Sequence, residues 1–191
     1  MIVEIHNEQA CLPADPRHRR AVRMILEDAS LGRAQVSVAV VDDPTIRRLH
    51  REYLGEDSPT DVMSFVLERD DDYLEGEVVA SAQTACAAAP EFGWPAADEL
   101  LLYVIHGALH LVGYDDTSPR LRAEMRKQER AYLARFGLDG RYRKSTEKSA
   151  GKPAARPAKK STAKAAGKPT AKPAGKPTSK PRKTKAGKEI A

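Results

Sequence analysis

Cysteine, long apolar runs and basic leader sequences are scarce or absent in this chain of 191 residues. Its two cysteines, Cys11 and Cys86, are far apart in the sequence and neither has a C-x-x-C partner, which argues against a disulfide framework. The longest apolar run, Leu100–Ile105, is far below the roughly 20 residues of a membrane span. The first residues, MIVEIHNEQ, do not combine a basic segment with a long apolar core, so we expect no secretory signal. We therefore expect a reduced, soluble, cytoplasmic protein with no membrane partner.

Lysine is almost missing from residues 1–143, where Lys127 is the only one. This segment has 17 Lys and Arg against 25 Asp and Glu, a net charge of −8. Residues 144–191 have 15 Lys and Arg, but only two acidic residues, a net charge of +13. The chain therefore divides into an acidic body, residues 1–143, and a basic tail, residues 144–191.

The basic tail has the composition of a disordered segment. It repeats Gly-Lys-Pro, contains no aromatic residue, and has only Ile190 as an aliphatic side chain larger than alanine. Such a segment cannot bury enough surface to offset its ordering entropy. We expect the tail to bind nucleic acid through its charge, without sequence discrimination. A solubilising linker, or a segment that contacts its own acidic body, is the alternative.

The spacing of apolar residues predicts an α+β body. Alternating or β-branched segments predict strands at 1–6, 34–43, 61–68 and 75–81. Helices are expected at 15–32, from Asp43 with Ile46, Leu49 and Tyr53 facing inward, at 82–92, at 95–113 and at 118–137. The last two strands are close enough to form a hairpin, whereas helices join the earlier strands, which can be parallel. We therefore predict one domain with a mixed four-stranded sheet packed by helices, the apolar helix 95–113 running through its middle.

Two histidines lie four residues apart on the expected central helix, in the segment HGALHLVGYDD. Residues i and i+4 share a helix face, so His106 and His110 can bind one ion. Gly113 is well placed to end the helix, and Asp116 can then return as the third ligand. Two histidines, a carboxylate and an open position form a catalytic zinc site. Two satisfied core histidines are the alternative, which the offsets of Gly113 and Asp116 disfavour.

Two neighbours of these residues bear on the chemistry. The spacing also matches metzincin proteases, in which Glu follows the first histidine and acts as general base. Here that residue is Gly107, so proteolysis is disfavoured. Asp115 is either a carboxylate that orients a histidine N–H, a general base, or the acidic start of a turn.

The segment HGALHLVGYDD resembles the signature H-G-x-L-H-L-x-G-Y-D-H of the YbeY-type endoribonucleases, the bacterial ribosomal RNA maturation factors. Two further segments are similar to that family: PTDVMSF, which follows its P-T-D-V-L-S-F pattern, and GEVVAS, in the place of its G-D-I-x-I-S strand. The resemblance covers roughly residues 1–140.

The resemblance implies a single α/β domain that holds one zinc ion and acts on single-stranded RNA. It further implies a role in ribosomal RNA processing, notably at the 3′ end of the small-subunit RNA, and in ribosome quality control. The metal ligands of the family map onto His106, His110 and Asp116. Thr60, Asp61 and Ser64 are then expected to line the metal cleft and touch RNA; the alternative is that they are ordinary turn and strand residues.

The chain departs from the family pattern at two positions. The third ligand of the family is histidine, and Asp116 in its place adds a negative charge that weakens Lewis acidity and opposes a phosphate. The family arginine in Y-R-G-x-D is replaced by Leu54, which cannot bind phosphate. Arg51, one helical turn earlier, is a candidate substitute. The leading hypothesis is a zinc-dependent endoribonuclease, and the alternative is a non-catalytic RNA-binding ribosome-assembly factor with a structural metal.

Overall fold

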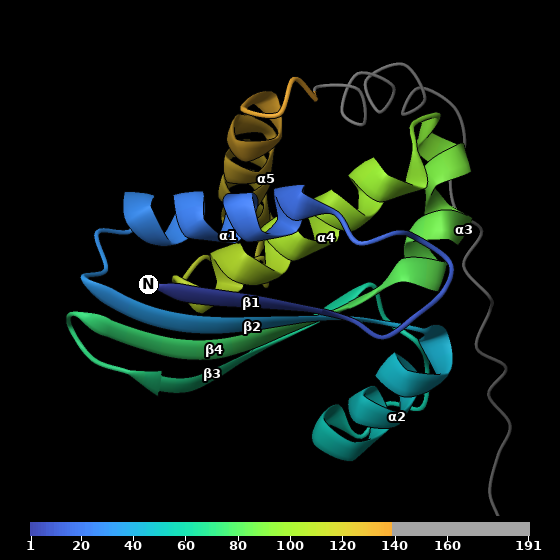
Figure 1. Ribbon diagram of the computed structural model, residues 1–191, viewed down its shortest axis with the longest axis horizontal. Helices are drawn as coiled ribbons and strands as arrows, with labels where there is room; N and C mark the ends of the chain where they lie inside the picture. The colour runs from blue at the N-terminus through green and yellow to red at the C-terminus, as the bar shows by residue number, and fades with distance from the viewer. Residues whose placement is uncertain (139–191) are drawn as a thin grey trace, which may run out of the picture. The chain divides into compact units, whose positions relative to one another are not determined.

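The structure, a computed structural model, describes residues 1–138, so the boundary expected at residue 143 and the basic tail lie outside the described residues. Within these residues the chain forms four strands and five helices (Figure 1). They are β1 (Ile2–Asn7), α1 (Pro16–Asp28), β2 (Arg33–Val41), α2 (Asp43–Leu54), β3 (Val62–Arg69), β4 (Tyr73–Ser81), α3 (Ala82–Phe92), α4 (Ala96–Leu111) and α5 (Pro119–Ala134).

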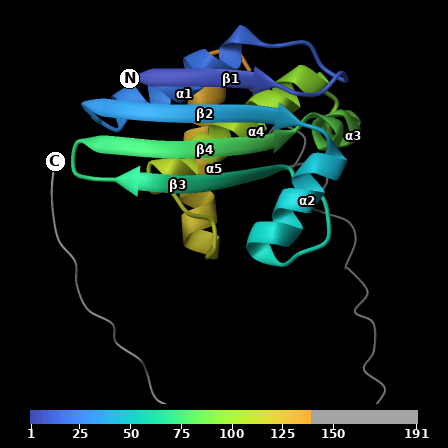
Figure 2. The same cartoon turned by 60° about the horizontal axis from the view of Figure 1, so that its bottom comes forward.

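The four strands form one mixed sheet in the order β1-β2-β4-β3, which Figure 2 shows from the side of the strands. β2 pairs in parallel with both β1 and β4, because α1 and the α2–β3 segment carry the chain back between them. β3 pairs antiparallel with β4 across the acidic turn, where the Asp70 N–H donates to the Tyr73 carbonyl at 2.9 Å. The predicted mixed sheet with its terminal hairpin is confirmed.

The two faces of the sheet are covered unequally. On one face, alternate residues such as Val36, Val38 and Val78 are fully buried beneath α1 and α4 (Figure 1). On the other face, a small cluster around Met63 and Val79 packs against Ile46 of α2. The alternation of strand side chains therefore gives one large core under four helices and one small core under α2.

α4 is apolar nearly all round because it contacts α1, α3, α5, β3 and β4. Its close contact with the sheet depends on Gly107. A Cβ there would lie 2.7 Å from Val78 Cγ1 and 2.9 Å from both Val62 Cγ2 and Ser64 Oγ. No side chain fits in that space, so the backbone of α4 rests directly on β3 and β4. Among residues 1–138, no helix combines the length and apolarity that crossing a membrane requires.

One local prediction was wrong, and a second was only partly confirmed. α1 was expected to stop at Gly32, but it ends at Asp28, and Ser30 takes the left-handed conformation with φ of 57°. The chain reverses at Ser30 because Leu31 has to turn into the core, where it is 7% exposed. Tyr53 was expected to face inward, and its ring does lie against Phe65, with centroids 5.1 Å apart, but it is 61% exposed because it packs at the edge of the small core.

Candidate functional site

His106 and His110 lie on one face of α4 and point at each other. Their Nε2 atoms are 3.0 Å apart, and the rings meet nearly perpendicular, with centroids 4.6 Å apart. The side chain of His106 is 23% exposed, so the pair is reachable from solvent although the helix that carries it is buried. The i, i+4 spacing therefore brings two imidazole nitrogens to one point.

Each ring is anchored by its other nitrogen. His106 Nδ1 donates to Glu129 Oε1 of α5 at 2.7 Å, and His110 Nδ1 donates to the Tyr114 carbonyl at 3.0 Å. A carboxylate and a carbonyl can only accept, so both Nδ1 atoms carry hydrogen and both Nε2 atoms face the common point. Two nitrogen lone pairs at 3.0 Å repel each other, so a proton on one Nε2 or a cation bound by both stabilises this arrangement.

Glu129 is the functional residue that sequence reasoning missed. It is 6% exposed and lies one helical turn after Met125, which is 1% exposed, on the inward side of α5. An acidic residue on an otherwise apolar helix face was the signal that could have found it. The carboxylate that orients a histidine is therefore Glu129, a role that the sequence suggested for Asp115.

The turn after α4 positions His110. Gly113 takes a φ of 101°, and the Tyr114 N–H donates to the Leu109 carbonyl at 3.0 Å, so the chain folds back over the end of the helix. This reversal brings the Tyr114 carbonyl onto the His110 ring. Arg69 of β3 donates to the Leu111 carbonyl at 2.8 Å and satisfies another terminal carbonyl of α4. The end of the helix is thus held by the sheet and by its own following turn.

The two histidines differ electrostatically. Burial lowers the pKa of His106, but the hydrogen bond and the charge of Glu129 outweigh it, and Asp61 and Asp116 add to the increase, so that the pKa is raised overall. Burial and the charge of His106 lower the pKa of His110, against weaker opposite effects of Tyr114 and Asp116. His106 is therefore the more basic ring of the pair.

Asp116 lies near the pair without contacting it. Its charge acts on both histidines, and its side chain makes no hydrogen bond within residues 1–138. That part of the chain contains no group of three His, Cys, Asp or Glu residues arranged closely enough to hold a metal ion. The structure thus brings together two of the three expected ligands and leaves the third in their vicinity.

Asp115 is used by the turn. Its carboxylate accepts hydrogen bonds from the Asp116 N–H at 2.7 Å and from the Thr117 hydroxyl at 2.6 Å. The hydrogen bond of Thr117 lowers the pKa of Asp115 most strongly. These bonds shape the loop that carries Asp116.

Thr60, Asp61 and Ser64 lie at or near the start of β3, on the side of α4 that carries Gly107. Ser64 Oγ donates to the Gly107 carbonyl at 3.0 Å, between the two histidines in the sequence. Asp61 accepts from the Thr60 hydroxyl at 3.1 Å and from the Val62 N–H at 2.9 Å, and its charge reaches His106. Ser64 therefore touches the histidine helix, and Asp61 lies close enough to influence it.

Arg51 and Leu54 lie on α2. The Arg51 guanidinium is 3.8 Å from Asp57 Oδ1, beside the bidentate pair that Arg47 forms with the same carboxylate. No interaction connects Arg51 to the histidine pair within the described residues. Leu54 is 62% exposed.

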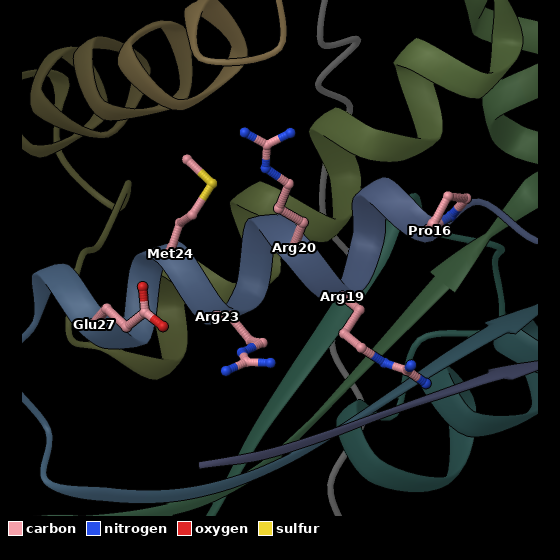
Figure 3. A pocket seen from close by; sticks show the side chains of 6 residues that line it. All are labelled: Pro16, Arg19, Arg20, Arg23, Met24 and Glu27. Carbon is pink, nitrogen blue, oxygen red and sulfur yellow. The ribbon is translucent and has the colours of Figure 1, made fainter.

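Positive charge gathers on α1, where Arg19, Arg20 and Arg23 line a hollow of about 390 Å³ (Figure 3). Arg19 and Arg23 point to one side of the helix and Arg20 to the other. Arg20 lies over the ring of Phe136 at 5.4 Å. None of the three forms an ion pair with a carboxylate of residues 1–138, although Glu27 lines the same hollow. These guanidinium groups are available for an anionic ligand.

Comparison with known proteins identifies relatives. The family model described as Endoribonuclease YbeY matches residues 4–137. A protein of Rhodopirellula baltica named Endoribonuclease YbeY is 48% identical over 109 residues, which are 56% of each chain. Proteins of the same name from Moorella thermoacetica and Desulfitobacterium hafniense are 36% and 32% identical, each over 72% of this chain and 99% of their own length.

The matched residues include every strand and helix of the sheet-and-helix fold except the first two residues of β1, together with the histidine pair. The basic tail lies beyond the match. On this evidence the chain belongs to the YbeY endoribonuclease family.

Proposed function

We propose that this chain is a zinc-dependent endoribonuclease that cleaves single-stranded RNA and acts in the cytoplasm in ribosomal RNA maturation, including the 3′ end of the small-subunit RNA, and in ribosome quality control. The observation that carries the proposal is the pair of Nε2 atoms 3.0 Å apart, each held by an anchored Nδ1. Family membership supports RNA as the substrate, because the relatives are named endoribonucleases.

The donor set fits a zinc ion. Imidazole nitrogens and a carboxylate are common zinc ligands, and His106 and His110 already present theirs toward one point. Asp116 is the third ligand if its carboxylate turns toward the pair, which no hydrogen bond within the described residues opposes. A zinc ion held by these residues would supply Lewis acidity toward a phosphate oxygen and toward water.

The residues of the chain supply orientation. Glu129 keeps the His106 ring in the tautomer that leaves Nε2 for binding, and the Tyr114 carbonyl does the same for His110. We assign Asp115 to shaping the loop of Asp116, because both its carboxylate oxygens are engaged there. Ser64, which is bonded to the Gly107 carbonyl, lies next to the site and is our candidate for a contact with RNA, with Thr60 and Asp61 beside it.

Affinity for RNA has to come from elsewhere. Asp61, Asp115 and Asp116 surround the histidines with negative charge, which repels phosphates in the absence of a bound cation. Arg19, Arg20 and Arg23 on α1 and the +13 charge of the basic tail provide the opposite sign. We propose that these groups hold the RNA backbone, with the salt dependence that counterion release produces.

A second candidate function is a non-catalytic ribosome-assembly factor that binds RNA and keeps a metal for structure. Two observations favour it: Leu54 takes the place of a phosphate-binding arginine of the family, and Asp116 takes the place of its third histidine ligand. Under this alternative the protein binds RNA but does not cut it.

Metal analysis and RNA cleavage separate the two functions. We expect the wild type to bind one zinc ion, measured by elemental mass spectrometry, and to cleave a single-stranded RNA oligonucleotide. His110→Ala should lose both zinc and cleavage, whereas Asp116→His, which restores the ligand of the family, should keep both and cleave faster. Zinc binding without cleavage by the wild type would establish the assembly factor.

A truncation after Arg143 should bind RNA more weakly and with a smaller salt dependence; unchanged affinity at low salt would remove the tail from the proposal.

A further inference from the structure

The two cysteines of the chain meet in the folded protein. Cys11 lies in the loop between β1 and α1, and Cys86 lies on α3, yet their Sγ atoms are 2.7 Å apart. Both are free thiols. A disulfide bond is about 2.05 Å long, so only a small movement separates the pair from a covalent link. β2 pairs in parallel with both β1 and β4, which places the start of α3 beside the end of β1. The two cysteines therefore lie close together although they are 75 residues apart in the sequence.

The loop that carries Cys11 is held in place by the side chain of Gln9. Gln9 Oε1 accepts from the Cys11 N–H at 2.6 Å and from the Leu12 N–H at 2.9 Å, while Nε2 donates to the Leu12 carbonyl at 2.8 Å. On the other side, Ser81 caps α3 by accepting from the Thr84 N–H at 3.1 Å. Both backbones are thus fixed before any bond forms between the thiols.

Cys11 is the more accessible of the two thiols. Cys11 is exposed and lines a hollow of about 690 Å³ next to the ends of β1 and β2, whereas Cys86 is partly buried. Gln83 of α3 and Asp42, which caps α2, lie on other sides of this hollow. The space is large enough for a small disulfide molecule to approach the Cys11 sulfur from solvent.

We propose that Cys11 and Cys86 are a redox-sensitive pair that closes into a disulfide bond and clamps the β1–α1 loop onto α3. The oxidant is a small-molecule disulfide. The Cys11 thiolate attacks one sulfur, forms a mixed disulfide and releases one thiolate. Cys86 then gives up its proton and attacks Cys11 Sγ, which expels the second thiolate. Two protein thiols are oxidised and one small disulfide is reduced to two thiols.

The protonation of Cys86 is consistent with this order. Burial raises its pKa most, and the hydrogen bond and charge of Cys11 add to the increase, to about 11. Cys86 therefore stays protonated while Cys11 is free. Once Cys11 is in a mixed disulfide, its charge no longer opposes ionisation of Cys86, which favours the second step.

The clamp has a physical consequence for stability. It closes a loop from residue 11 to residue 86 that contains α1, β2, α2, β3 and β4, and it thereby restricts the unfolded chain. The oxidised protein should melt at a higher temperature. Reducing agents should reverse the effect, as expected of a disulfide that responds to its surroundings.

The test uses the full-length chain incubated with oxidised glutathione. We expect both thiols to disappear, the mass of the monomer to fall by two hydrogens, and the melting temperature to rise by about 5 °C or more, all reversed by dithiothreitol. Cys86→Ser should stop at a glutathione adduct on Cys11, and Cys11→Ser should react little; neither should gain thermal stability.

Three results would overturn the proposal: two thiols that remain titratable, a disulfide that joins two chains, or an internal disulfide with no rise in melting temperature. None of these measurements involves RNA or metal. The proposal can therefore fail while the endoribonuclease stands, and the reverse also holds.

Discussion

Both ends of α4 carry ionisable side chains, but the hydrogen bonds of these side chains serve different purposes at the two ends. At the N-terminal end, Asp98 accepts from Arg17 Nη1 at 2.6 Å and Glu99 accepts from the Trp94 indole N–H at 2.6 Å. At the C-terminal end, His106 and His110 anchor one nitrogen each and turn the other toward a common point. The first end fastens elements together, and the second end keeps binding atoms available. The structural and the functional end of α4 therefore differ in whether the ionisable side chains serve contacts within the protein alone or also leave one atom to bind a ligand.

The largest effect is expected from Glu129, the buried carboxylate of α5 that contacts the C-terminal end of α4. Glu129→Gln keeps the volume of the side chain but removes the charge that supports His106. We expect zinc affinity to fall about 10–100-fold, measured by competition with a chromophoric chelator. Glu99→Gln is the matched control and should leave zinc affinity unchanged. An equal loss in both variants would mean that the two ends are not functionally distinct.

A smaller effect is expected from the ion pair that ties α1 to α4. Asp98 is 8% exposed, and Asp98→Ala leaves the guanidinium of Arg17 with Asp15 as its remaining partner. We expect the free energy of unfolding in urea to fall by about 1–2 kcal/mol, since charge-assisted bonds at partly buried sites contribute this much. Asp57→Ala, which breaks an exposed pair with Arg47, should cost less. A larger loss from Asp57→Ala would contradict the assignment of the N-terminal end to stability.

The smallest effect concerns His18, next to Arg17 on α1. It is 1% exposed, and neither ring nitrogen has a hydrogen-bond partner among residues 1–138. Burial lowers the pKa of His18 below its ordinary value of 6.5. The unfolded chain therefore binds a proton before the folded one does, and stability is complete above about pH 6.5 and declines as the pH falls below it.

His18→Leu should flatten this part of the stability profile, measured by urea unfolding between pH 5 and about 7.5. His6→Leu changes a histidine whose side chain is 52% exposed and should keep the slope of the wild type. A slope that persists in His18→Leu would show that another group causes it.

Local patterns predicted much of this molecule. The strands and helices were predictable because each depends on the pattern of consecutive residues. The pairing of His106 with His110 was predictable for the same reason, since an i, i+4 spacing brings two side chains together within one helix. The hairpin of β3 and β4 followed from a short acidic turn. The predicted end of α1 was wrong because the chain reverses at Ser30 to bring Leu31 into the core. Helix propensity does not encode where Leu31 finds space in the folded protein.

Contacts between distant segments were not predictable in the same way. Glu129 meets His106 only because α5 crosses α4, and Cys11 meets Cys86 only because β1 and β4 flank β2. Both contacts depend on tertiary arrangement, which a single sequence constrains weakly. For Glu129 the sequence at least offered a hint, an acid on an apolar helix face. For the cysteines it offered none.

The glycine between the two histidines limits how this site can evolve. A protease of the related histidine pattern needs glutamate at position 107. Yet even the first carbon of that side chain would collide with Val62, Ser64 and Val78 in two strands. Acquiring that glutamate would therefore require side chains of β3 and β4 to change together with residue 107.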